Sequence, residues 1–216
     1  ELVTKHSTIM DRYDPAKRVA LAVDEWGIWT DVEPGTNPGF LYQQNSLRDA
    51  LVAATSLNIF NNHSDRVRLA NLAQTVNVLQ AIVLTKGTQM LLTPTYHVFD
   101  MYKVHMDAKK LPVSFTSPDY IVEDRKIPAV NISASQDSTG AVHITLVNLD
   151  PNKKINIRTA LPGIKWATVK GSVLTSKKLT DINSFENPNA ITIASFSGAK
   201  KENNDLVIEL PAQSIV

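Results

Sequence analysis

The segment Val19–Trp29, with the sequence VALAVDEWGIW, constrains the fold more than any other part of the chain. A continuous apolar run, rather than an alternating one, is typical of a parallel strand that is covered on both faces. This run leads directly into Asp24 and Glu25. In parallel sheets and barrels, ligand sites lie at the carboxyl ends of the strands, where the loops converge. The segment therefore predicts a buried strand that ends in a carboxylate, with Glu25 as the strongest candidate site residue.

Each residue of this segment also has a purely structural interpretation. A carboxylate after an aliphatic strand must be solvated or paired, so a satisfied structural role explains Glu25 about as well as a catalytic one on spacing alone. Asp24 should face the opposite side of an extended strand. Trp26 and Trp29 are by residue type more often packing residues than ligand platforms, although indole faces suit the C–H faces of sugars.

Composition narrows the range of functions. The 216 residues are 43% hydrophobic, which is enough for one large core or two smaller ones. The net charge is +1 without a long block of either sign, so neither a nucleic-acid nor a membrane partner is expected. No cysteine, metal-ligand spacing of histidines or Gly-rich phosphate loop is present, so no metal or cofactor is expected. A cysteine-free chain suits an oxidising compartment without requiring one, so the sequence leaves the compartment open, with a periplasmic or secreted location slightly favoured over a cytoplasmic one.

The first hundred residues alternate between strand and helix patterns. Residues 1–18 predict the end of a helix and then a turn, and residues 30–44 form a long loop rich in Pro and Gly. Ser46 and Asp49 form a Ser-x-x-Asp helix start, and this helix should end at residues 61–64.

A second long apolar run, Val67–Leu84, follows that helix. Asn71, Gln74 and Asn77 recur every three residues, so a helix is possible. The length of the run fits better a buried strand that ends near Gln74 and continues into an apolar loop. The amides of Gln74 and Asn77 in such a run most simply make structural hydrogen bonds. Thr93-Pro94 then predicts a helix start, with the helix reaching about His105. The order strand, helix, strand, helix predicts β/α architecture.

From about Leu111 the pattern changes to short segments with period-two alternation, separated by Gly, Pro, Asn and Asp. This pattern predicts an antiparallel β-sandwich of roughly 100 residues. The expected strand segments are NISASQ, AVHITLVNL, KINIRTAL, KWATVKGSVLTS, AITIAS and DLVIELPAQSIV.

The motifs VDEWGIW, EPGTNPGFLYQQNSLRDALVAATSLNIFNNHSDRVRLANLAQTVNVL and LTPTYHVFDMYKVH resemble the family 51 glycoside hydrolases, the α-L-arabinofuranosidases. The resemblance runs in order from about residue 10 to residue 150 and continues more weakly to SFENPNAI. It implies an α/β plus all-β fold, with the last two βα units of a (β/α)₈ barrel in residues 1–108 and an antiparallel β-sandwich in residues 109–216. The two apolar strands would be barrel strands seven and eight.

The same resemblance implies roles for individual residues. Glu25 would be the nucleophile of a retaining mechanism, Trp29 would help to wall the sugar site, and Gln74 would hydrogen-bond the arabinofuranosyl ring. The family often has Asn where Gly27 stands here, which indicates a subfamily difference in the shape of this loop. No metal or organic cofactor is implied, and the intact enzyme is expected to be a homo-oligomer.

A retaining glycosidase needs two carboxyl groups about 5 Å apart. In the resembling family the acid/base glutamate follows an asparagine, and no Asn-Glu pair occurs in this sequence. Asp31 and Glu33 are the nearby substitutes, but nothing presents them as proton donors. We therefore expect the chain to be a C-terminal fragment that is inactive alone and exposes apolar surface on its barrel strands.

The leading functional hypothesis is a hydrolase that releases terminal α-L-arabinofuranosyl residues from arabinan- or arabinoxylan-type polysaccharides or oligosaccharides. The first alternative is a non-catalytic carbohydrate-binding or structural module that uses the sandwich and the two indoles. The second is a related β-glycosidase with another sugar preference. A second carboxylate close to Glu25 would distinguish an enzyme from a binding module.

Overall fold

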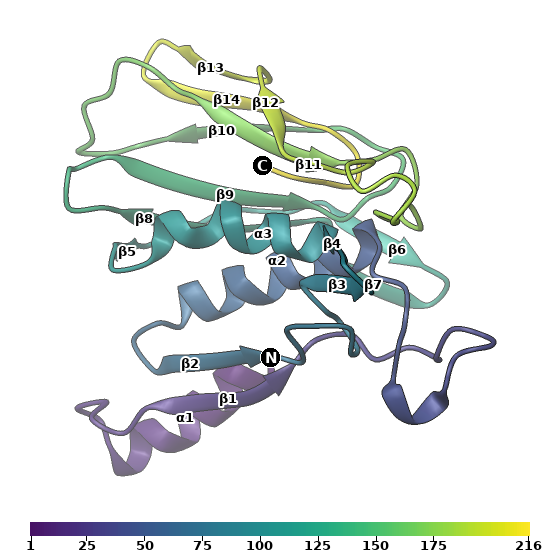
Figure 1. Cartoon of the computed structure of the whole chain (residues 1–216). Helices are drawn as coiled ribbons and strands as arrows, with labels where there is room; N and C mark the ends of the chain where they lie inside the picture. The colour runs from purple at the N-terminus through teal and green to yellow at the C-terminus, as the bar shows by residue number, and fades with distance from the viewer.

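The structure is a computed structural model that describes residues 1–216. Its helices are α1 (Leu2–Tyr13), α2 (Leu47–Asn62) and α3 (Pro94–Tyr102), with 3₁₀ turns at Pro38–Phe40 and Lys103–His105. Its strands are β1 (Leu21–Trp26), β2 (Val67–Leu72), β3 (Val83–Lys86), β4 (Gln89–Leu92), β5 (Lys109–Leu111), β6 (Asp119–Val122), β7 (Arg125–Pro128), β8 (Val130–Gln136), β9 (Val142–Asn148), β10 (Ile155–Ala160), β11 (Gly171–Thr175), β12 (Ala194–Phe196), β13 (Ala199–Glu202), β14 (Asp205–Leu210) and β15 (Ser214–Ile215). Figure 1 shows α2 and α3 between the β1–β2 pair and the larger sheets.

Strands β1 and β2 form a two-stranded parallel sheet, which confirms the predicted β/α order. The pairing runs from Leu21 opposite Val67 to Trp26 opposite Leu72, with register shifts after Leu21 and after Val23. The expected burial of β1 on both faces is wrong, because the burial of its side chains alternates and only the side toward the helices is covered. Val19 and Leu69 are 60% and 52% exposed, so this part of the molecule does expose apolar surface.

Helices α2 and α3 begin at the predicted capping residues. The Ser46 backbone N–H and hydroxyl each donate to Asp49 Oδ2 at 2.8 Å, which closes the first turn of α2. Thr93 caps α3, with Pro94 in its first turn. The two helices pack together through small buried side chains of α2 and the side chains of Val98 and Tyr102 on α3.

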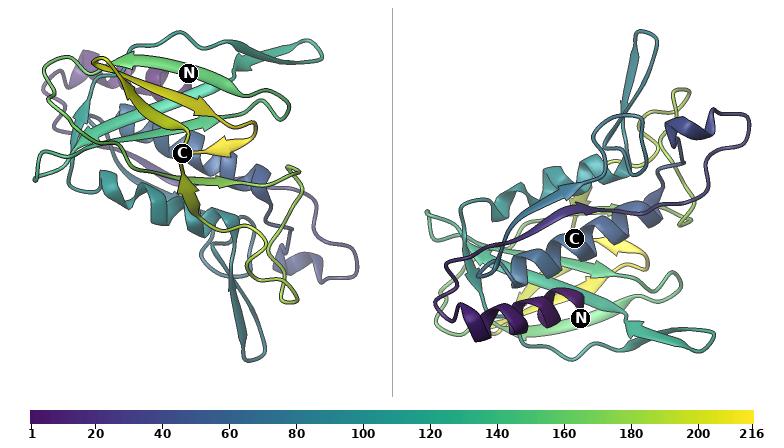
Figure 2. Two further views of the ribbon diagram at one scale, coloured as in Figure 1. Left: turned by 90° about the horizontal axis from the view of Figure 1, so that it is seen from above. Right: turned by 90° about the horizontal axis from the view of Figure 1, so that it is seen from below.

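The largest sheet has six strands in the order β12-β11-β15-β9-β8-β5, and it faces a three-stranded sheet in the order β10-β14-β13. Because side chains alternate along a strand, each face of the six-stranded sheet joins a different core. On β9, Leu146 lies in the core between the sheets, whereas Val147 lies in the core shared with α2 and α3. Figure 2 shows these sheets stacked over the helices from two further directions.

A buried polar cluster joins the helices to the six-stranded sheet. Asn58 Oδ1 on α2 accepts hydrogen bonds from the hydroxyls of Tyr102, Ser133 and Thr145 at 3.0, 2.8 and 2.7 Å. The His105 ring contacts the same group, with Nε2 3.1 Å from Thr145 Oγ1. Burial lowers the pKa of His105 to about 4, so this ring is neutral at neutral pH. We call these five residues the Asn58 cluster.

The fold class is thus α/β plus all-β, with an antiparallel β-sandwich after the parallel pair, as predicted. Two hairpins, β3–β4 and β6–β7, were not predicted. In the segment KWATVKGSVLTS only Gly171–Thr175 is a strand, whereas Trp166 and Val169 pack on the sandwich core from irregular backbone. The large apolar side chains of this segment are therefore at least partly covered, as expected, but the predicted strand pairing before Gly171 is wrong. None of the helices is both long and apolar enough to cross a membrane.

Candidate active site

The carboxylates of β1 lie at an irregularity in the parallel pair. Between Val23 and Trp26 strand β1 advances three residues while β2 advances two, from Ala70 to Leu72. Such a bulge changes the direction in which the side chains of a strand point, and bulges are common beside active sites. Here Asp24 and Glu25 are both exposed between the half-buried side chains of their neighbours. The simple expectation that strict alternation would set the direction of Asp24 does not apply at this point.

The two tryptophans that flank Glu25 have different environments. The Trp26 indole packs edge-on against Phe60 of α2, with centroids 5.5 Å apart, and stacks on Phe99 of α3 at 6.1 Å. It anchors the end of β1 to both helices, which agrees with the packing interpretation. Trp29 is 70% exposed and therefore remains available to a ligand.

Gly27 turns the chain directly after β1. Its φ of +144° lies in the region that favours glycine. A Cβ atom at this position would lie 3.2 Å from Gln80 Oε1 and 3.4 Å from the Ala73 carbonyl oxygen. The missing side chain therefore leaves space for the neighbouring buried amide of Gln80.

Two buried glutamines hold the backbone that follows. The Ile28 N–H donates to Gln80 Oε1 at 2.8 Å, and the Thr30 N–H donates to Gln43 Oε1 at 2.9 Å. Gln43 Nε2 donates in return to the Ile28 carbonyl at 3.1 Å. Sequence reasoning missed both residues. The available signal was Gln80 inside the apolar run 67–84, since a buried amide requires partners.

Gln74 and Asn77 follow β2 at the same end of the sheet. The Ala73 N–H donates to the Trp26 carbonyl at 3.0 Å, which ties the segment before Gln74 to the end of β1. Gln74 is exposed. Asn77 has the structural role that was expected, because its side chain exchanges hydrogen bonds with Thr85 on β3 at 2.7 and 2.8 Å.

The nearby substitute carboxylates lie in the loop after β1. Asp31 is exposed and lines a shallow depression with Trp29, Thr30 and Val32. Glu33 accepts a hydrogen bond from Gln44 Nε2 at 3.2 Å. Burial, followed by the charge of Glu33, raises the pKa of the neighbouring Tyr42. No group of three or more His, Asp or Glu side chains has a metal-binding arrangement.

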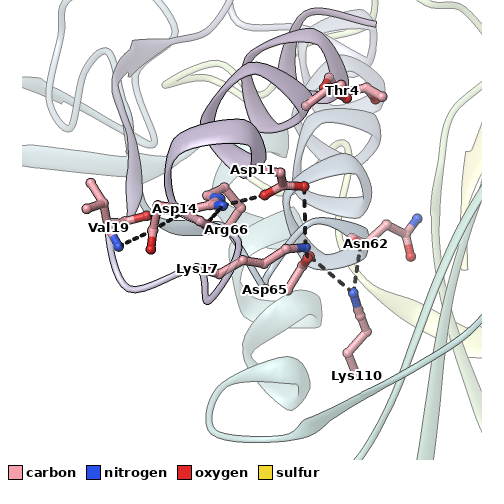
Figure 3. Close-up of polar contacts among 10 residues, drawn as sticks. Thr4, Asp11, Asp14, Lys17, Val19, Asn62, Asp65, Arg66 and Lys110 are labelled. Atoms are coloured by element: carbon pink, nitrogen blue, oxygen red, sulfur yellow. Dashed lines mark hydrogen bonds and ion pairs between the residues drawn. The ribbon is translucent and has the colours of Figure 1, made fainter.

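The opposite end of the β1–β2 pair is fixed by charge. Arg66, immediately before β2, has a fully buried side chain. Its Nη1 donates to Asp14 Oδ2 at 2.9 Å and to the Val19 carbonyl at 2.8 Å, and its Nη2 donates to Asp11 (Figure 3). The hydrogen bond to Asp11, with burial opposing it, raises the pKa of Arg66. Arg66 therefore joins the end of α1 to the starts of both strands.

Asp65 extends this group of charges toward the sandwich. It pairs with Lys17 and with Lys110 Nζ, the latter at 3.4 Å (Figure 3). The hydrogen bond from Lys17 is the main reason that the pKa of Asp65 falls to about 2. We call Asp11, Asp14, Lys17, Asp65 and Arg66 the N-terminal clamp. The clamp fixes one end of the strand pair, and the buried glutamines hold the loop at the other.

Comparisons with known proteins agree with this architecture. The family model for the α-L-arabinofuranosidase C-terminal domain matches residues 24–214. The whole chain is 49% identical to the intracellular exo-α-L-arabinofuranosidase of Bacteroides ovatus and covers 42% of that protein. Among solved structures, the family 51 arabinofuranosidase of Xanthomonas axonopodis pv. citri is 50% identical with a TM-score of 0.97, over 99% of this chain and 43% of that one.

A more distant solved structure, a family 51 α-L-arabinofuranosidase from Bifidobacterium longum, is 25% identical with a TM-score of 0.82. It is matched over 99% of this chain and 45% of its own, so the chain spans less than half the length of these relatives. The Bacteroides relative is named intracellular, so the expected periplasmic or secreted location is wrong. A sequence without cysteine is compatible with either compartment. With a family model matched over most of its length, the chain belongs to the α-L-arabinofuranosidase C-terminal domain family.

Proposed function

We propose that this chain is the nucleophile-bearing C-terminal portion of an enzyme that releases terminal α-L-arabinofuranosyl residues, with retention, from arabinan- or arabinoxylan-type glycans. The main supporting observation is the exposed carboxylate of Glu25 at the bulged carboxyl end of a parallel strand. In this proposal β1 and β2 belong to the end of a (β/α)₈ barrel in residues 1–108, and residues 109–216 form the sandwich. Glu25 attacks the anomeric carbon, while Trp29 and Gln74 contact the sugar.

We propose that the second carboxyl group comes from outside this chain. Retention requires an acid that protonates the departing oxygen about 5 Å from the nucleophile and then activates water. Asp49 is fully buried and its carboxylate is used in the cap of α2, and Glu33 is bonded to Gln44. In this proposal the 216-residue chain alone is inactive, and the acid/base is supplied by the further length that the relatives possess.

The chemistry also limits the partners. A displacement between two carboxyl groups needs no metal or organic cofactor. Because the net charge is +1, we propose an arabinose-containing glycan rather than a nucleic acid or a membrane as the partner. We further propose that the enzyme acts in the cytoplasm, as the name of the Bacteroides relative suggests, and that the intact enzyme is a homo-oligomer.

The test compares hydrolysis of an aryl α-L-arabinofuranoside by this chain and by the chain preceded by the upstream region that its relatives carry. Only the longer protein should turn over the substrate. Glu25→Gln should abolish that turnover. Asp24→Asn, at the adjacent exposed carboxylate, is the matched control and should retain turnover. In Glu25→Ala, azide should restore release of the aryl group and yield a glycosyl azide of inverted configuration. Full turnover by Glu25→Gln would rule out the proposed nucleophile.

A further inference from the structure

The backbone on either side of Trp29 is held by side-chain amides rather than by a neighbouring strand. Three backbone groups that flank Trp29, the Ile28 N–H, the Ile28 carbonyl and the Thr30 N–H, bond to Gln80 and Gln43 at 2.8, 3.1 and 2.9 Å. Gln43 therefore makes a two-point contact that spans Trp29. In this way the two amides replace the hydrogen bonds that an adjacent strand would supply.

The side-chain amides of Gln80 and Gln43 are themselves held in one orientation by burial and hydrogen bonds. Gln80 is fully buried, and its Nε2 donates to the Asp49 carbonyl at 2.8 Å and to Thr95 Oγ1 at 3.2 Å. Because both Nε2 hydrogens are used, its Oε1 is directed at the Ile28 N–H. Gln43 is 1% exposed, and its side-chain amide uses Oε1 and Nε2 for the Thr30 N–H and the Ile28 carbonyl, while its backbone carbonyl accepts from Asn45 Nδ2 at 3.1 Å. The first turns of α2 and α3 thus reach the loop through Gln80.

The residue held between these contacts is an exposed aromatic. Trp29 is 70% exposed, although the peptide groups on both sides of it bond to buried partners. A side chain that binds a ligand loses less conformational entropy when its backbone is fixed in advance. The combination of fixed backbone and free indole is what a preorganised wall of a binding site requires.

We propose that Gln43 and Gln80 are positioning residues that hold the Trp29 indole at the end of β1 and so set the affinity for the arabinofuranosyl ring. Neither amide touches the substrate, because both are buried beneath the loop. Gly27 is part of the same arrangement, since its missing Cβ leaves space for Gln80 Oε1. The identity of the ligand in this inference rests on the proposed function, whereas the positioning of Trp29 by the two glutamines does not.

The positioning is tested without sugar, by the indole N–H signals of Trp26, Trp29 and Trp166 in ¹H–¹⁵N spectra of the 216-residue chain. Trp29→Phe assigns the relevant signal. Gln43→Met should shift and broaden the Trp29 signal while the signal of Trp166, in the sandwich, stays unchanged. Gln44→Met is the matched control, because this adjacent glutamine is exposed, and it should leave all three signals in place.

Gln80→Met is the second variant, and it decides the question if Gln43→Met does not fold. An unchanged Trp29 signal in the folded variants would overturn the proposal. In the longer protein, either glutamine variant should raise KM for the aryl arabinofuranoside about tenfold, equivalent to about 1.4 kcal/mol, with kcat nearly unchanged. This effect should vanish in a Trp29→Ala background, and an undiminished effect there would also contradict the proposal. Absence of turnover by the unsubstituted longer protein would count against the proposed function alone, because the spectra do not depend on it.

Discussion

Replacement of Asn58 by leucine should destabilise the chain by breaking the contact between α2 and the six-stranded sheet. The Asn58 carbonyl oxygen accepts from three buried hydroxyls, and each such hydrogen bond contributes about 1 kcal/mol net to stability. The Nδ2 group of Asn58 is buried without a partner, so its removal offsets part of that loss. We expect a decrease of about 2 to 3 kcal/mol in the free energy of unfolding.

For a chain of this length, that loss corresponds to a decrease in Tm of roughly 4–12 °C. The assay is thermal unfolding of the 216-residue chain, followed by circular dichroism and calorimetry. Asn61→Ala is the matched control, because Asn61 Nδ2 makes a single hydrogen bond to Ser133 Oγ at 3.2 Å. Asn61→Ala should lower the free energy of unfolding by about 1 kcal/mol. If Asn58→Leu melts within about 2 °C of the unsubstituted chain, the cluster is not a source of stability and the reasoning fails.

Three further outcomes are expected. Gly27→Ala should lower the free energy of unfolding, measured by chemical denaturation, by about 1–3 kcal/mol because of the positive φ at this position. Gly35→Ala should lower it less, because φ is also positive there but no atom lies within 4 Å of an added Cβ. Equal losses of stability would remove the role given to the contact with Gln80. Burial lowers the folded-state pKa of His105 to about 4 from its ordinary value of 6.5, so the stability of the chain should fall as pH decreases from 6.5 to 4. His105→Gln should make Tm depend less on pH in this range. An unchanged slope of Tm against pH would contradict this prediction. Arg66→Met should lower Tm far more than Arg18→Met, an exposed neighbour of the clamp, since it removes a fully buried guanidinium and leaves Asp11 and Asp14 without this partner. Similar shifts would show that the clamp is not needed.

The local signals in the sequence predicted the helices well. The Ser46–Asp49 capping box and the Thr93–Pro94 start both act within one turn of backbone, so they are visible without tertiary structure. Period-two alternation located most sandwich strands for the same reason. It failed at residues 165–170, where Trp166 is packed on the core without being part of a strand.

The parts of the candidate site that depend on distant contacts could not be predicted. Gln43 and Gln80 are 37 positions apart in the chain, and only the fold brings both to the loop after β1. The different environments of Trp26 and Trp29 depend in the same way on where α2 and α3 pack. The burial of β1 was overestimated because an apolar run reports which residues can be covered and not what covers them.

The two-sided packing of the six-stranded sheet has a consequence for recombination between family members. One face of β8 and β9 closes the sandwich, while the other carries Ser133, Thr145 and Val147 against α2 and α3. A sandwich transplanted from a relative at a junction placed just before β5 would bring its own version of that second face. Such a chimera is expected to work only if the grafted strands keep hydroxyls opposite Asn58, so the unit of exchange is the sandwich together with both helices.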